Sequence, residues 1–168
     1  MLALGAAPLR QRRLQRDVLL DTVDGQLLAA GTALRVRADG NHAFFTFKGP
    51  VVASAVKARN EIETAADSAE ALLSICAALG YQPVFRYEKY REEFSTPGVV
   101  VAVDDTPIGT FVEIEGDETT IHALAARLGF APADYVTQSY RALFMASALA
   151  ATGARDMTFP TTSPSRTP

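Results

Sequence analysis

The sequence predicts an α+β fold in which antiparallel strands form a sheet flanked by helices. The strongest observation is a series of side-chain pairs spaced two residues apart with a mostly apolar residue between them. The like-charged pairs are Arg35/Arg37, Glu61/Glu63, Lys89/Arg91 and Glu113/Glu115, and Thr46/Lys48 has the same spacing. Because residues i and i+2 project from the same face of a strand, each pair puts two polar side chains on one face and leaves the other for a core.

Seven segments have strand-like composition or alternation. They lie near 14–21, 33–38, 43–49, 58–65, 83–95, 98–104 and 110–115. Glycine- and proline-containing stretches separate them, as expected for turns. Asp39-Gly40-Asn41, between two alternating segments, predicts a hairpin turn.

Three helices are expected between and after these strands, over 67–79, 117–128 and 132–150. The first two end in the same way, as Leu79-Gly80-Tyr81 and Leu128-Gly129-Phe130, with glycine at the C-cap. Leu2-Ala3-Leu4-Gly5-Ala6 resembles the end of such a helix. We therefore expect the chain to begin within an element whose first turns are absent; a frayed N-terminal arm is the alternative.

Length and composition favour one domain of about 1–150 followed by a disordered Thr/Ser/Pro-rich tail over 151–168. The net charge of −3 gives no argument for nucleic-acid binding. No apolar run is long enough to span a bilayer, and no signal peptide opens the chain. A single cysteine excludes an intrachain disulfide. We expect a cytoplasmic protein without nucleic-acid or membrane partners. The apolar last helix, which includes Tyr140, Leu143, Phe144 and Leu149, would pack on the sheet or on a second subunit, so a homodimer is possible.

The charged strand faces have two interpretations. They can form an open solvated surface, as is common in antiparallel sheets, or they can line a shared concave site. In the second case, arginine and lysine side chains would face glutamates across a cavity. Arginine binds phosphate oxygens bidentately, and clustered carboxylates suit Mg²⁺ or Mn²⁺. A lumen with both kinds of side chain would suit a metal–polyphosphate complex.

The order of these motifs resembles the CYTH domain of the triphosphate tunnel metalloenzymes, which include class IV adenylate cyclases and thiamine triphosphatases. The resemblance runs from about residue 11 to about residue 145. It rests on Gln15-Arg16-Asp17 with Asp21-Thr22, Leu34-Arg35-Val36-Arg37, Phe45-Thr46-Phe47-Lys48, Arg59-Asn60-Glu61-Ile62-Glu63, Lys89-Tyr90-Arg91, Asp104 with Gly109-Thr110-Phe111-Val112-Glu113-Ile114-Glu115, and Ser139-Tyr140.

The resemblance implies an eight-stranded antiparallel β-tunnel flanked by helices. It implies substrate binding by Arg35, Arg37, Lys48, Lys89 and Arg91, and metal binding by Glu113 and Glu115 with Glu61, Glu63 and, more weakly, Asp104. Among these, Lys48, Arg91, Glu61 and Glu63 are the expected catalytic residues. The cofactor would be Mg²⁺ or Mn²⁺, and the partner a small-molecule triphosphate.

One family motif, the first strand E-x-E-x-K, is absent from this sequence. By the resemblance, its glutamates share the metal site and its lysine contacts substrate. Either the start of the sequence is set too late or the tunnel lacks one strand. Three functions therefore stay open: metal-dependent hydrolysis of tripolyphosphate or a nucleoside triphosphate, cyclic AMP synthesis by a class IV adenylate cyclase, and non-catalytic binding of polyphosphate or nucleotide.

Overall fold

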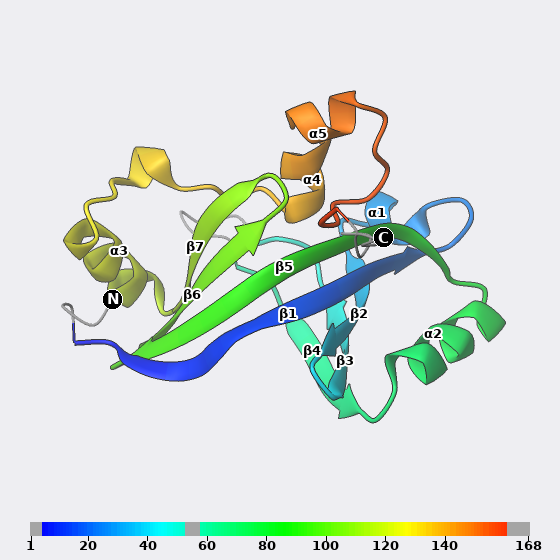
Figure 1. Ribbon diagram of the computed structural model, residues 1–168, viewed down its shortest axis with the longest axis horizontal. Coiled ribbons are helices and arrows are strands. Elements are labelled where there is room, and N and C mark those ends of the chain that lie inside the picture. The colour runs from blue at the N-terminus through cyan, green and yellow to red at the C-terminus, as the bar shows by residue number, and fades with distance from the viewer. Residues whose placement is uncertain (1–4, 53–57, 161–168) are drawn as a thin grey trace, which may run out of the picture.

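The computed structural model describes residues 5–52 and 58–160, and its centre is one antiparallel sheet of seven strands (Figure 1). The strand order is β4-β3-β2-β1-β5-β6-β7. The strands are β1 (Ala7–Asp21), β2 (Ala33–Asp39), β3 (His42–Lys48), β4 (Glu61–Ala66), β5 (Gln82–Thr96), β6 (Val99–Thr106) and β7 (Gly109–Gly116). The expected α+β class and antiparallel sheet are confirmed, with seven strands in a sheet that is not closed.

The two longest strands, β1 and β5, form a ribbon that carries the rest of the sheet. They pair from Ala7↔Ser95 to Asp21↔Gln82, with register shifts near both ends. β2 pairs with residues 15–20 of β1, and β6 pairs with residues 90–96 of β5. Because β1 and β5 run in opposite directions, the two groups of shorter strands attach toward opposite ends of the ribbon, as Figure 1 shows.

Two helices cover the outer face of the sheet, one on each group of strands. Helix α2 (Ala69–Ala78) packs Leu72, Leu73 and Cys76 against a core that includes Leu34 and Val36. Helix α3 (Glu118–Arg127) packs Ile121 and Leu124 against Val99, Val101 and Ile114. Ser68 and Asp117 accept hydrogen bonds from the backbone N–H groups of Ala71 (3.1 Å) and Thr120 (2.9 Å), so both helices have the N-caps that their sequences favour.

A third apolar cluster lies on the inner face and closes one end of it. Phe85 and Tyr87 of β5 pack with Phe144 of α4 (Tyr140–Met145) and with Met157, and both Phe144 and Met157 are fully buried. The short helix α5 (Ala148–Ala151) follows α4 and contributes Leu149 and Ala150. The apolar packing expected of the last helical region is therefore directed at the sheet.

The segment after α5 covers an open edge of β5. The N–H of Met157 donates to the carbonyl of Arg86 (2.9 Å), and the N–H of Glu88 donates to the carbonyl of Met157 (2.8 Å). β6 pairs with β5 only from Tyr90 onward, so this segment lies where β5 has no strand neighbour on that side. The disordered tail predicted from residue 151 is therefore wrong for residues 151–159; residues 161–168 lie outside the described part of the chain.

The third predicted helix, 132–150, is also wrong in extent. This region contains a 3₁₀ turn (Pro132–Asp134), an extended stretch and then α4 and α5. Ser139 and Ser147 accept hydrogen bonds from the N–H groups of Ala142 (3.2 Å) and Ala150 (3.4 Å). Each serine therefore starts a new short helix where a continuous one was expected.

Two further differences concern the first half of the chain. β1 begins at Ala7 rather than near residue 14, because its exposed first half pairs with the end of β5. A short helix α1 (Gln26–Ala29), not foreseen from the sequence, connects β1 to β2. The predicted helix end at Leu2–Gly5 falls mainly outside the described residues. Within those residues, no helix is long and apolar enough to cross a membrane.

We predict that Met157→Ala lowers the free energy of unfolding by about 2–5 kcal/mol, because it empties a fully buried position between β5 and α4. Chemical denaturation followed by circular dichroism measures this loss. Met145→Ala is the matched control, since Met145 is 67% exposed and its truncation should cost less than about 0.5 kcal/mol. Equal effects of the two variants would contradict the packing of the C-terminal segment.

Candidate functional site

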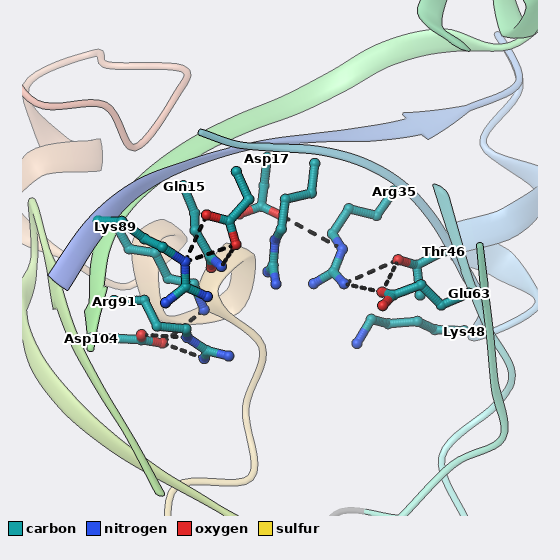
Figure 2. A network of polar contacts seen from close by, with 12 residues as sticks. Gln15, Asp17, Arg35, Thr46, Lys48, Glu63, Lys89, Arg91 and Asp104 are labelled. Carbon is teal, nitrogen blue, oxygen red and sulfur yellow. Dashed lines mark hydrogen bonds and ion pairs between the residues drawn. The ribbon is translucent and has the colours of Figure 1, made fainter. Parts of the chain in front are cut away.

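The inner face of the sheet carries a dense set of charged side chains from all seven strands. Figure 2 shows side chains of β1, β2, β3, β4, β5 and β6 reaching into one space under the arch of the sheet. The cations are Arg35, Arg37, Lys48, Lys89 and Arg91, and the anions around them are Asp17, Glu61, Glu63, Asp104, Glu113 and Glu115. Of the two interpretations of the charged faces, the structure therefore favours the shared concave site.

Asp17 on β1 holds the two arginines of β2. It stands directly opposite Arg37 in the strand register, and its side chain has no exposed surface. The Nε–H of Arg37 donates to Asp17 Oδ1 at 2.8 Å, and Arg35 Nε lies 3.5 Å from the same oxygen. Burial opposes the charge on Arg37, but Asp17 outweighs it and raises the pKa of this guanidinium above its ordinary value.

Asp104 on β6 has the same role for the two cations of β5. Its Oδ2 accepts from Lys89 Nζ, from a terminal nitrogen of Arg91 and from the hydroxyl of Tyr140, each at 2.7 Å. Its Oδ1 accepts from Arg91 Nε at 2.7 Å. Asp104 also has no exposed side-chain surface. Both of its oxygens therefore bind only the two β5 cations and Tyr140 among the described side chains.

Glu113 and Glu115 lie on β7 at the rim of this cluster. Glu113 accepts a hydrogen bond from Arg91, and Glu115 Oε1 lies 3.8 Å from a terminal nitrogen of the same arginine. Burial would raise the pKa of Glu113, but Lys89 and Arg91 hold it well below its usual range. Burial, Glu113 and Asp104 together raise the pKa of Tyr140, which keeps its hydroxyl a neutral donor.

The opposite edge of the inner face is formed by β3 and β4. Lys48 Nζ lies 2.7 Å from Glu61, and Arg35 donates to Thr46 (3.1 Å) and Glu63 (3.3 Å). Burial, aided by Arg35 and opposed by Glu61, lowers the pKa of Lys48 to about 8. This lysine is therefore a cation whose charge changes near neutral pH.

Exposure divides the carboxylates into two classes. Asp17 and Asp104 are fully buried at the centre, whereas Glu61, Glu63 and Glu115 have 42%, 45% and 65% of their side chains exposed. Exposed ion pairs are weak because water competes for both partners. An incoming anion can therefore displace the glutamates at the rim while the central aspartates keep the cations in place.

Three buried atoms at the centre have no hydrogen-bond partner among the described side chains. They are Oε1 of Gln15, Oδ2 of Asp17 and Nε of Arg35. Buried polar atoms are normally satisfied by protein, water or ligand. The site therefore has hydrogen-bonding capacity that its own side chains do not use.

The predicted metal ligands do not meet at one point. Glu61 and Glu63 lie on β4 and Glu113 and Glu115 on β7, at the two edges of the sheet, while Asp104 is occupied by Lys89, Arg91 and Tyr140. In the described ranges, no group of three His, Cys, Asp or Glu side chains is arranged to hold a metal ion. Mg²⁺ commonly uses one or two carboxylates and completes its shell with phosphate and water. Glu113 and Glu115, on one face of β7, fit that smaller role.

Several residues of the site were not assigned a role from the sequence. Gln15 and Asp17 have the same two-residue spacing as the charged pairs, and that spacing could have identified them. Asp39 extends the network beyond Gln15. It forms a 2.7 Å ion pair with Arg13 and accepts a 2.7 Å hydrogen bond from the side chain of Gln15. Tyr140 was assigned to packing alone. No local pattern indicates its contact with Asp104, because 36 residues separate the two.

The fold is an antiparallel sheet whose concave face carries paired basic and acidic side chains. Residues 7–140 match the CYTH domain, so the chain belongs to the CYTH domain family. This match confirms the family resemblance found in the motifs.

A curated relative from Methanocaldococcus jannaschii, named "Putative adenylate cyclase MJ0240", is 29% identical over 106 residues, which are 62% of this chain. The chain covers 61% of that relative's length.

Solved structures share the fold at low identity. A protein of Vibrio parahaemolyticus described as a "putative adenylate cyclase" has a TM-score of 0.71 at 21% identity, covering 83% of this chain and 84% of its own. The PH1012 protein of Pyrococcus horikoshii has a TM-score of 0.74 at 21% identity, with 84% and 88% covered. A Hippeastrum protein, described as a "putative adenylyl cyclase" with a dominant triphosphatase activity, has a TM-score of 0.65 at 16% identity, with 82% and 83% covered.

We predict that Asp104→Ala lowers the free energy of unfolding by about 3–5 kcal/mol, because it leaves Lys89 and Arg91 buried without their central carboxylate. Urea denaturation at neutral pH measures the change. Asp105→Ala is the control: this neighbour points to the other face and pairs with exposed Arg12, so its loss should cost about 1 kcal/mol or less. A loss for Asp104→Ala no larger than the control's would contradict the role of this carboxylate.

Proposed function

We propose that this protein binds the triphosphate chain of tripolyphosphate or a nucleoside triphosphate on the inner face of the sheet and hydrolyses its terminal phosphoanhydride bond. The observation that carries the proposal is the convergence of five cations from β2, β3 and β5 on one concave face, four of them held by two fully buried aspartates. A chain of phosphates presents charge along a line, and cations distributed across a curved sheet match such a ligand.

Binding would proceed by exchange of anions. Phosphate oxygens would replace the exposed glutamates beside Lys48 and Arg35, and Asp17 and Asp104 would keep Arg37 and Lys89 oriented. The exchange is favourable because each exposed glutamate returns to water, while a triphosphate brings several charges on one ligand. Arg35 would bind a phosphate oxygen through the terminal nitrogen that lies 3.3 Å from the half-exposed Glu63.

Catalysis would rest on position and charge. Water attacks the terminal phosphorus and the bond to the bridging oxygen breaks, which leaves negative charge on the departing phosphate chain. Arg91 and Lys48, on the two sides of the inner face, would neutralise that charge, with Arg91 kept in orientation by the buried Asp104. Mg²⁺ or Mn²⁺ held by Glu113 and Glu115 would supply further neutralisation of the phosphate oxygens.

Hydrolysis is the first choice over cyclic AMP synthesis for a specific reason. Hydrolysis requires only contacts to the triphosphate, and the inner-face cations supply candidates for all of them. Cyclisation requires in addition that the ribose 3′-hydroxyl be held against the α-phosphorus. The description of the Hippeastrum structure, with its dominant triphosphatase activity, adds support for hydrolysis in a protein of this fold.

The test measures binding and turnover separately. The full chain is incubated with tripolyphosphate or ATP and with Mg²⁺ or Mn²⁺, and phosphate and cyclic AMP are measured in the same reactions. We expect phosphate release that requires the metal. Cyclic AMP as the main product would favour the cyclase, tight binding without turnover would favour a binding module, and the absence of binding would refute the proposal.

Lys48→Ala should weaken tripolyphosphate binding by about tenfold, the effect of losing one hydrogen bond to a charged partner. Isothermal titration calorimetry without metal measures the affinity. Arg16→Ala is the control, because Arg16 is also a strand cation but is exposed and bound to Glu88, away from the inner-face network. If Arg16→Ala has the same effect, binding is non-specific and the site is wrong.

The pH dependence gives an independent prediction for Lys48. Its pKa of about 8 means that the side chain is charged below pH 8 and neutral above it, in the field of Arg35, Arg59 and Glu61. Affinity for tripolyphosphate should therefore fall as pH rises from 7 to 9. In Lys48→Arg this fall should disappear, because a guanidinium stays charged. Protonation of the ligand itself affects both proteins equally, so identical pH profiles would contradict the assignment.

A further inference from the structure

Tyr140 connects the C-terminal helices to the centre of the charged site. Its hydroxyl donates to Asp104 Oδ2 at 2.7 Å, the oxygen that also accepts from Lys89 and Arg91. Lys89 Nζ lies 5.1 Å from the centre of the tyrosine ring, within reach of a cation–π interaction. Tyr140 therefore contacts both the carboxylate that orients the β5 cations and one of those cations.

The tyrosine ring is itself held firmly. Phe111 of β7 meets it edge-on at 5.5 Å between ring centres, and Tyr87 of β5 packs at 5.8 Å. Ser139 caps the first turn of α4, and Phe144, one turn after Tyr140, is fully buried against Phe85. The helix thus places the hydroxyl group at a defined position relative to both β5 and β7.

The contacts of Asp104 show what this hydroxyl adds. Four donors from three side chains approach its two oxygens, so together they fix the orientation of the carboxylate group. Arg91 uses both oxygens, and Lys89 and Tyr140 both approach Oδ2. Without the hydroxyl, the carboxylate can turn toward the remaining cations, and Lys89 is no longer held between a ring face and a fixed oxygen.

We propose that Tyr140 is a positioning residue, which acts through Asp104 to hold Lys89 and Arg91 in the orientation that binds the triphosphate. The inference rests on the proposed function and extends it to a residue that touches neither phosphate nor metal. Its effect is on affinity, because the hydroxyl is already satisfied by Asp104 and has no donor left for the ligand.

The first test compares two Tyr→Phe variants. Tyr140→Phe should weaken tripolyphosphate binding about fivefold, somewhat less than the loss of a direct hydrogen bond to a charged group. Tyr135→Phe is the matched control, since its hydroxyl bonds to Nδ1 of His122 at 2.8 Å beside α3. Calorimetry gives the affinity and thermal unfolding gives the stability. Equal affinities of the two variants would overturn the inference.

A double-mutant cycle separates positioning from a general structural effect. Combined with Lys89→Met, which removes the amine that Asp104 holds, Tyr140→Phe should have a smaller effect on affinity than in the unchanged protein, because only Arg91 is left to position. Combined with Lys48→Ala, whose lysine pairs with Glu61 on the other edge, the two losses should add. Additive losses with both partners, or an affinity loss that follows a fall in melting temperature, would make Tyr140 merely structural.

The outcomes also separate this inference from the proposed function. If the unchanged protein does not bind tripolyphosphate, the proposed function fails and the role of Tyr140 fails with it. If the protein binds and Tyr140→Phe binds equally well, only the positioning role fails. Should Lys89→Met not fold, the comparison of Tyr140→Phe with Tyr135→Phe decides alone.

Discussion

Two buried aspartates set the arrangement of the inner face. Asp17 and Asp104 have no exposed side-chain surface, and each forms ion pairs with the two basic residues of a neighbouring strand. Placing five cations in a curved sheet, three of them buried, would be strongly unfavourable without such partners, because charges lose their hydration on burial. The exposed glutamates at the rim are less constrained. This division into fixed central anions and exchangeable outer ones allows the same face to be stable alone and still receptive to a polyanion.

The long β1–β5 ribbon explains how residues far apart in sequence reach this face. One group of strands attaches at each end of the ribbon, so β2 and β6 bring their side chains to it from opposite sides. Apolar packing by α2 and α3 occupies the outer face of both groups. The charged pairs then have only the inner face available, and the alternation of each strand decides which side chains point inward.

Much of this arrangement could be predicted from local patterns. The two-residue spacing correctly predicted that Arg35 and Arg37 share a face of their strand, as Lys89 and Arg91 do, and the glycines after α2 and α3 marked where those helices end. The partners of the charged residues could not be predicted in the same way, because Asp104 meets Tyr140 and Asp17 meets Arg37 only through tertiary pairing. The same limit applies to the early start of β1 and to the docking of Met157 on β5. In both segments the backbone pairs with β5 because of contacts between residues far apart in the chain, although the local sequence has no strand pattern.

The short C-terminal segment on β5 also bears on how this protein behaves at high concentration. A sheet edge with free N–H and carbonyl groups can recruit a strand from another molecule. Met157 occupies those groups at Arg86 and Glu88, and its side chain is inserted beside Phe144. A chain cleaved before this segment would present an unpaired edge next to exposed aromatic surface, a combination that promotes self-association and aggregation.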